Sequence, residues 1–378
     1  MVASLVLITY LLYFNRLGTL LPGYNVTEVT TLKNAANWHQ ILTDPVSLPY
    51  RSIVWLLTAA LHRSILMTRV VAACFGLVMA LLFFAITRSW CGFRTAFLTT
   101  IMFATSAGLL HFARLGTGQV LQMGMLVLLA GALWYRRQRK HRILIAYVLV
   151  AACALLWYTP GMLWFELLGL LLLRQVIRSQ LRRLRTQHLA AVIALTLLCL
   201  APLLVAAVRA PRVLLQITGL PQALSSLSHF GSNLANIILA MFIHSNGRPL
   251  LWVGHAPLLD AAEVILGFIG AYYVYRAGSP RTTYLFGSLG IGIILVALGG
   301  SVSFACLVPA LYIFIAIGID HFLGRWLTVF PRNSFAQAAG ISLVCVMIGF
   351  SVLYQVRTYF IAWPYAPATR AVFNKHQS

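Results

Sequence analysis

The sequence predicts an all-α, polytopic integral membrane protein. Of its 378 residues, 61% are hydrophobic and 9% are charged, whereas a typical soluble domain has about 25% charged residues. The mean hydropathy is +0.87, and the apolar residues come in runs close to the length that a helix needs to cross a bilayer. The net charge of +22 lies largely in short links between these runs. That placement is typical of cytoplasmic membrane loops and not of a nucleic-acid-binding face.

The apolar runs predict about eleven membrane-spanning helices when each is compared with the ~20 residues of one span. They lie near residues 2–21, 66–87, 95–112, 119–135, 143–158, 161–173, 188–208, 258–275, 283–300, 302–322 and 336–356. The first run lacks a basic start and a small-residue cleavage site, so we expect a retained helix and not a signal peptide. We therefore expect one membrane domain over residues 1–378, without a soluble C-terminal domain.

The basic links orient these spans. The links 136–142 and 174–188 carry five Lys or Arg residues each, while the links 158–161 and 299–302 carry none. Since cytoplasmic loops are enriched in Lys and Arg, the basic links are predicted to lie inside. Alternation then puts the two long loops, 22–65 and 209–257, on the outer face of the cell membrane.

Short apolar stretches within the long loops predict helices that lie in the membrane interface. Residues 26–42 show apolar positions at helical spacing among polar ones, which is typical of an interfacial helix. The stretches 52–61 and 233–243 are apolar but too short to span. Helices of this kind around a polar cleft would suit a substrate carried by membrane lipids.

Charged residues gather on the predicted outer side. Charge in a membrane bundle is costly unless it is paired or functional, so a mixed group of acids and arginines predicts a pocket for an anionic ligand. Taken singly, each residue could instead be solvated, or could fix the depth of its helix. The group comprises Glu28, Asp44, Glu166, Asp260, Glu263, Arg51, Arg69, Arg114, Arg209 and Arg248.

Glu28 is the candidate catalytic residue. It follows the turn signal Pro22-Gly23, which places it at the start of a helix, where the helix dipole favours an anion. An ionised carboxylate at the membrane surface suits a general base, and the arginines suit a phosphate, which guanidinium groups bind bidentately. Asp260 and Glu263 also fit a simpler role at a helix N-terminus.

The six cysteines are scattered and no Cys or His spacing matches a metal motif, so neither disulfides nor zinc are expected. We predict no cofactor, with a divalent ion bridging a phosphate kept as the alternative.

The order of motifs resembles the GT-C superfamily, in particular its protein O-mannosyltransferase and aminoarabinose transferase-like branch. The shared features are an acid on the first outer loop (Glu28), an R-x-x-x-A helix start at Arg69, and an Ala-Arg pair ending at Arg114. The segment from Asn233 to Asp260 is similar to the long loop of that family. The sequence departs from the pattern at Thr27-Glu28, where the family has Asp-Glu, and at 116–119, where many members carry another acid.

The resemblance implies an inverting membrane glycosyltransferase that uses a polyprenyl-phosphate-linked sugar outside the cytoplasm, with Glu28 as general base. The donor phosphate would contact Arg69, Arg114, Arg209 and Arg248. The acceptor, which could be a protein, a glycan or a lipid, would meet a pocket formed by Asp44, Arg51, Gln119, Glu166, His255 and Asp260. Two alternatives remain: an inactive relative that acts as a scaffold in envelope glycan assembly, and a transporter of lipid or solute.

Overall fold

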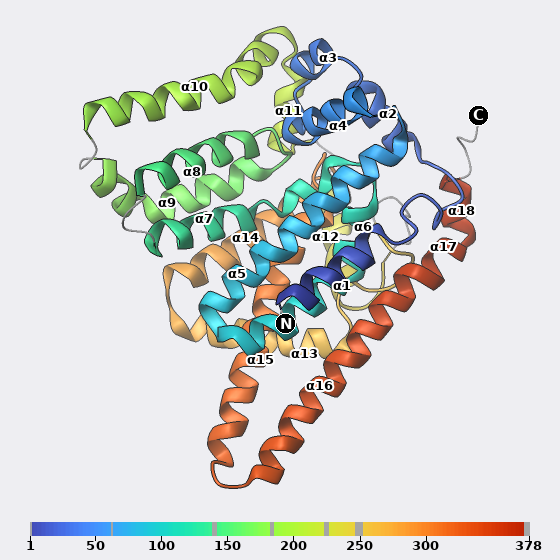
Figure 1. Ribbon diagram of the computed structural model, residues 1–378, viewed down its shortest axis with the longest axis vertical. Coiled ribbons are helices and arrows are strands. Elements are labelled where there is room, and N and C mark those ends of the chain that lie inside the picture. Colours follow the sequence, from blue (N-terminus) through green and yellow to red (C-terminus); the bar gives the residue numbers. More distant parts are fainter. Residues whose placement is uncertain are drawn as a thin grey trace.

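The computed structural model describes residues 2–61, 63–137, 142–181, 185–222, 227–245 and 252–373 and shows only helices and loops there (Figure 1). The first half contains α1 (Val2–Phe14), α2 (Val26–Asn34), α3 (Trp38–Thr43), α4 (Leu48–Ala60), α5 (Ile65–Thr105), α6 (Ala107–Arg114), the 3₁₀ helix η1 (Gly118–Met123), α7 (Met125–Arg137), α8 (Arg142–Leu156) and α9 (Met162–Leu181). The second half contains α10 (Thr186–Arg209), α11 (Arg212–Thr218), α12 (Leu227–Phe242), α13 (Ala261–Ala277), α14 (Pro280–Ala297), η2 (Phe304–Cys306), α15 (Val308–Val329), α16 (Ser334–Arg357), the π-helix η3 (Thr358–Ala362), α17 (Trp363–Tyr365) and α18 (Pro367–Phe373).

The membrane fold predicted from the sequence is confirmed. Among the described residues, five helical segments are long and apolar enough to cross a bilayer: 65–105, 186–209, 280–297, 304–329 and 334–365. Shorter apolar helices, among them 3–14 and 143–156, fall on other predicted spans. In Figure 1 the chain runs back and forth: α7 and α9 end at the left, where α8 and α10 begin.

The structure contains the two predicted spans 66–87 and 95–112, but the second is interrupted at Ser106. They belong to one helical hairpin, α5, whose arms meet at Gly92 with φ 81° and ψ 176°. Such a backbone conformation is open to glycine and disfavoured for other residues. The returning arm stops at Thr105, because Ser106 is extended and its hydroxyl caps the new helix α6 at the amide of Leu109. This break brings Arg114 to the end of a separate short helix.

The first long loop, residues 22–65, packs as three helices at one end of the bundle (Figure 1). The single helix expected over 26–42 is wrong in detail, because α2 ends at Asn34 and α3 begins at Trp38. The two asparagines that flank this break, Asn34 and Asn37, favour helix ends over helix interiors. Trp38 then packs on Trp55 of α4, with ring centroids 5.5 Å apart.

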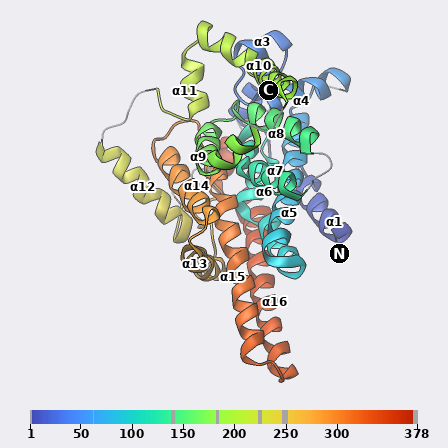
Figure 2. The same cartoon turned by 90° about the vertical axis from the view of Figure 1, so that its left-hand side faces the viewer.

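The helices α13 and α15 pack closely against each other, with α13 to the left of α15 in Figure 2. Their backbones touch at Gly270 and Gly318: a Cβ atom at Gly270 would lie 1.8 Å from the carbonyl oxygen of Phe314, and one at Gly318 would lie 2.0 Å from that of Leu266. Helices approach this closely in membranes where small residues face each other.

Candidate functional site

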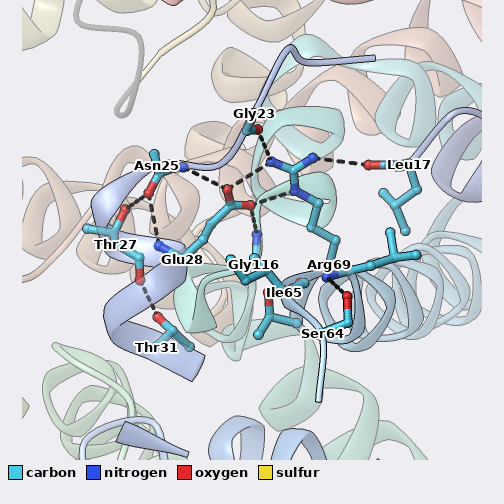
Figure 3. Close-up of polar contacts among 12 residues, drawn as sticks. Leu17, Gly23, Asn25, Thr27, Glu28, Thr31, Ser64, Ile65, Arg69 and Gly116 are labelled. Atoms are coloured by element: carbon cyan, nitrogen blue, oxygen red, sulfur yellow. Dashed lines mark hydrogen bonds and ion pairs between the residues drawn. The ribbon is translucent and has the colours of Figure 1, made fainter. Parts of the chain in front are cut away.

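Glu28 is oriented first by its own helix. Asn25 is the N-cap of α2, and its side-chain oxygen accepts a hydrogen bond from the amide of Glu28 at 2.9 Å. In return the amide of Asn25 donates to Oε2 of Glu28 at 3.2 Å, which completes a capping box. The hydroxyl of Thr27 donates to the same Asn25 oxygen. The predicted position of Glu28 in the first turn of a helix is therefore confirmed, and its side chain turns back over that turn (Figure 3).

Arg69, from the first turns of α5, meets Glu28 in a bidentate ion pair (Figure 3). Nε lies 2.7 Å from Oε1, and Nη2 lies 2.8 Å from Oε2. The exposed fraction of the side chain is 1% for Arg69 and 0% for Glu28. A buried pair of this geometry is stable only when the remaining polar atoms are also satisfied.

Backbone groups make the hydrogen bonds that the ion pair leaves unfilled on Glu28 and Arg69. The amide of Gly116 donates to Oε1 of Glu28 at 2.9 Å, so the four acceptor positions of the carboxylate are filled by Arg69, Gly116 and Asn25. Arg69 in turn donates to the carbonyl oxygens of Leu17 and Gly23 at 3.2 and 3.0 Å. In this conformation the carboxylate of Glu28 therefore has no acceptor position open to a ligand.

The contacts of Gly116 explain why glycine stands at the start of the segment 116–119. A Cβ atom at this position would lie 2.1 Å from the hydroxyl oxygen of Thr68 and 3.1 Å from Oε1 of Glu28. Only glycine therefore lets the chain after α6 bring an amide to the carboxylate. At Gly116 the chain passes Thr68, whose carbonyl accepts from Tyr50 at 2.5 Å. Burial raises the pKa of the Tyr50 phenol well above its ordinary value, and the charge of Glu28 adds to this shift, so Tyr50 remains a donor.

Arg114 lies near the same pair but is held by different atoms. Its Nη1 donates to the carbonyls of Leu12 and Tyr13 at 2.5 and 2.9 Å, and its Nη2 donates to Asn15 at 2.7 Å. Lysine or arginine at the carbonyl end of a helix is stabilising, and here Arg114 closes α1. Its Nε is buried and has no hydrogen-bond partner among the described residues, which leaves one donor for a ligand.

Tyr359, which no sequence motif indicates, completes the cluster. It lies in the π-helix η3 and is 1% exposed. Its hydroxyl interacts with Arg114, and its ring centroid is 5.7 Å from the guanidinium carbon of Arg114. Both Arg69 and Glu28 are close enough to act electrostatically on it. Single π-helical turns are frequent at functional sites, but no periodicity in the sequence marks this one.

Asp44 and Arg51 form a second, more exposed ion pair between α3 and α4. Nη1 of Arg51 lies 2.8 Å from Oδ2 of Asp44 and 2.6 Å from its carbonyl oxygen. Gln119 is the second residue of η1, and its Oε1 is buried without a partner among the described residues. Arg209 is exposed at the end of α10. Arg248 lies outside the described residues.

The other predicted pocket residues belong to separate networks. Glu166 accepts from Trp157 at 2.7 Å, and His255 contacts the carbonyl of Ser245 at 3.1 Å. Asp260 is the N-cap of α13 in a capping box with Glu263, which confirms the simpler role at a helix start. Glu263 is fully buried and accepts from Tyr312, Ser351 and Gln355, which joins α13 to α15 and α16. The hydrogen bonds described here for these four residues involve neither Glu28 nor Arg69.

No group of three His, Cys, Asp or Glu side chains that could hold a metal ion comes together within the described ranges. The arrangement is instead one acid, two arginines and a tyrosine, joined by backbone donors from distant segments. Its chemistry suits an anionic ligand and proton transfer, provided that one of the bonds to Glu28 is exchanged.

Together, the helical membrane bundle and the buried pair of Glu28 on the first loop and Arg69 in α5 define a polytopic membrane protein. Crystal structures of ArnT from Cupriavidus metallidurans have this fold, one bound to undecaprenyl phosphate and one in the apo state. The TM-score is 0.56 in both cases, at 13% and 14% identity, over 99% of this chain and 77% and 76% of theirs. No family model and no curated protein matches the sequence. At this identity the likeness establishes the fold.

Proposed function

We propose that this protein is a membrane glycosyltransferase that transfers a sugar from a polyprenyl-phosphate donor to an acceptor on the outer face of the cell membrane. The fold supports the proposal, because it is shared with ArnT, for which a structure with undecaprenyl phosphate exists. The observation that carries it is the buried cluster of Glu28, Arg69, Arg114 and Tyr359. A bundle that needed only structural support would gain more from apolar residues there.

In the proposed reaction, an acceptor hydroxyl attacks the anomeric carbon of the sugar. A new bond forms between that carbon and the acceptor oxygen, the bond to the phosphate oxygen breaks, and polyprenyl phosphate leaves with the electron pair. Attack from the face opposite the phosphate inverts the anomeric centre. Glu28 takes the proton of the acceptor hydroxyl, and arginine side chains stabilise the charge on the phosphate.

Glu28 can act as a base only after one donor leaves it. The bond from the Asn25 amide is the longest of the four, at 3.2 Å, and this amide belongs to the loop before α2. An acceptor hydroxyl that replaces the Asn25 amide would find an oxygen still oriented by Arg69. The unpartnered Nε of Arg114 provides a donor for the phosphate.

A catalytically inactive scaffold is the second candidate, and one observation favours it. All four acceptor positions of Glu28 are filled by protein groups, so the acid also has a complete structural role. In that case Glu28 would fasten the first loop to α5, and the protein would contribute to glycan assembly through its contacts with other enzymes.

The two candidates are separated by a transfer assay. Purified protein in lipid membranes is given a panel of radiolabelled polyprenyl-phosphate sugars, with wild type beside Glu28→Gln. Asp320→Asn is the matched control, since it makes the same acid-to-amide change at a half-buried residue that contacts Thr95 at 3.0 Å. Transfer by wild type and by the control, but not by a folded Glu28→Gln that still binds donor lipid, supports the enzyme. Equal transfer by Glu28→Gln would refute its role as base, and no transfer from any donor favours the scaffold.

A further inference from the structure

The turn of the α5 hairpin, residues 88–94, lies about one bilayer thickness away from the Glu28–Arg69 pair. The stretch of α5 from Arg69 to Arg88 is helical throughout and spans about 28 Å at the rise of an α-helix. The hydrocarbon core of a bilayer is about 30 Å thick. Since the loop 22–65 is predicted to lie outside, the turn is predicted to lie at the level of the inner headgroups.

Two arginines from other helices contact this turn. Arg137, the last residue of α7, donates from Nη2 to the hydroxyl of Ser89 at 3.1 Å. Arg281, in the first turn of α14, places its guanidinium carbon 5.0 Å from the ring centroid of Trp90. The end of α7 and the start of α14 belong to two links that the alternation of predicted spans puts inside. Three predicted inner links therefore meet at one place in the structure.

The hairpin turn contributes two arginines of its own, Arg88 and Arg94. The guanidinium carbon of Arg88 lies 5.6 Å from the ring centroid of Phe93, and both arginines are exposed. A guanidinium group that lies over an aromatic face keeps the N–H donors at its edge free for other partners. Aromatic rings therefore hold Arg88 and Arg281 in place while their edge donors stay available to an anion.

Positive charge exceeds negative charge at this turn. None of its arginines takes part in an ion pair among the described residues. The acid Asp320 reaches the residue after the turn, where its Oδ1 accepts from the hydroxyl of Thr95 at 3.0 Å. Like charges that gather at the boundary of a low-dielectric region repel each other, so a bound anion would stabilise the group. The group, here called the inner arginine cluster, consists of Arg88, Arg94, Arg137 and Arg281.

Exposed aromatic residues place the inner arginine cluster at the level of lipid headgroups. Trp134, one turn before Arg137 on α7, is 50% exposed, and Tyr272 and Tyr275 near the end of α13 are 55% and 72% exposed. The end of α13 leads into Arg281 through residues 278–280. Tyrosine and tryptophan are enriched where a bilayer meets water. The anion expected at this level is therefore the phosphate of a lipid.

We propose that the inner arginine cluster binds the phosphate of an anionic phospholipid in the leaflet opposite the Glu28–Arg69 site. Guanidinium groups bind phosphate oxygens bidentately, and clusters of basic residues at the ends of membrane helices bind anionic lipids. A phosphatidylglycerol headgroup has a net negative charge, whereas the phosphate of phosphatidylcholine comes with a choline cation that the arginines repel. The cluster therefore selects phosphatidylglycerol over phosphatidylcholine. This site goes beyond the proposed function and does not depend on it.

The test is native mass spectrometry of the full-length protein from detergent micelles that contain equal amounts of phosphatidylglycerol and phosphatidylcholine. Wild type should retain phosphatidylglycerol preferentially. One arginine at a membrane surface contributes about fivefold to the affinity for an anionic lipid, so Arg88→Gln and Arg281→Gln should each weaken phosphatidylglycerol binding about fivefold. The double variant should weaken it about 25-fold, since the two contributions add. Trp90→Leu keeps every arginine but removes the ring beneath Arg281, and it should weaken binding roughly two- to fivefold.

Two control variants remove an exposed arginine elsewhere. Arg332→Gln acts in the turn between α15 and α16, which projects below the rest of the bundle in Figure 1. Arg212→Gln acts at the start of α11, on the predicted outer side. Both should leave phosphatidylglycerol binding within about twofold of wild type, because distant surface charges are screened. Since Arg88 and Arg281 are also exposed, their variants should keep the thermal melt of wild type.

Preferential binding of phosphatidylglycerol, with losses confined to the variants at the turn, supports the site. An equal loss in Arg332→Gln and Arg281→Gln would overturn it, because the lipid would then be attracted by the whole positive face. Equal retention of the two lipids would overturn it as well. Displacement of the lipid by inorganic phosphate, but not by chloride at the same ionic strength, would indicate a site for free phosphate and would overturn the lipid assignment.

Discussion

The Glu28–Arg69 pair makes a quantitative prediction about stability. In Glu28→Gln the amide oxygen can still accept from Gly116 and from Nε of Arg69, but the NH₂ group takes the place of Oε2. This NH₂ group then faces two other donors, Nη2 of Arg69 and the amide of Asn25, which lie 2.8 and 3.2 Å from Oε2 of the original glutamate. Loss of one partner of a buried ion pair costs about 3–5 kcal/mol, so we expect a loss of about 3 kcal/mol in the free energy of unfolding.

A double-mutant cycle shows whether this cost belongs to the pair. Arg69→Met keeps most of the volume of the side chain and is expected to cost about 3–5 kcal/mol, because it leaves the carboxylate buried without a cation. The double variant should be less destabilised than the sum of the two single changes, with a coupling energy of about 2–3 kcal/mol. The measurement is the free energy of unfolding in mixed detergent micelles with increasing sodium dodecyl sulfate.

Additive effects would refute the reasoning, since they would mean that the two charges do not depend on each other in the folded protein. A loss below about 1 kcal/mol for Glu28→Gln, which is the range of exposed pairs, would also contradict the buried geometry. Lys33→Gln in the last turn of α2 serves as a surface control, because Lys33 has no ion pair among the described residues.

Three further substitutions test the packing and the site. Gly116→Ala should destabilise the protein by about 1–3 kcal/mol through overpacking, because its Cβ would lie 2.1 Å from the hydroxyl oxygen of Thr68. It should also abolish sugar transfer. The control Gly290→Ala, which has open space at its Cβ, should be neutral or stabilising in a thermal melt. Gly270→Ala should be more severe, since its Cβ would lie 1.8 Å from a backbone carbonyl of α15, and loss of folded protein on size exclusion would show it. Tyr359→Phe keeps the ring but not the hydroxyl beside Arg114; it should weaken donor-lipid binding roughly tenfold while the melting temperature moves little, and unchanged binding would remove Tyr359 from the site.

The sequence predicted much of the fold because hydrophobic run length is a local property. The spans at 188–208 and 336–356 correspond to α10 and α16 within a few residues. The turn at Gly92 falls in the predicted link between the spans 66–87 and 95–112. The break at Ser106 was not predicted, because this residue ends the returning arm through its own backbone conformation and does not interrupt the hydropathy pattern.

The site was predicted by residue type but not by pairing. The sequence indicated Glu28 as the general base and Arg69 as a contact of the donor phosphate, but not as partners of each other. Sequence alone does not show that an acid on the first loop reaches a guanidinium 41 residues later. The amide of Gly116 is 88 residues away from Glu28, and its role depends on the absence of a side chain. One local signal was present: Asn25 followed by Glu28 three residues later is the pattern of a capping box, and it would have shown that the acid turns back towards its own helix.

The glycine contact between α13 and α15 limits how these two helices can move relative to each other. Where backbone meets backbone at Gly270 and Gly318, no side chain is available to rotate out of the way, and helices in such contact cannot slide without a clash. We therefore expect rearrangements that admit a bulky lipid to take place on the side of α4, α5, α7 and α8, where mostly apolar side chains line a cavity of about 140 Å³. The helices α13 and α15 would keep their relative position, and the substrate would enter only on the side of α4, α5, α7 and α8.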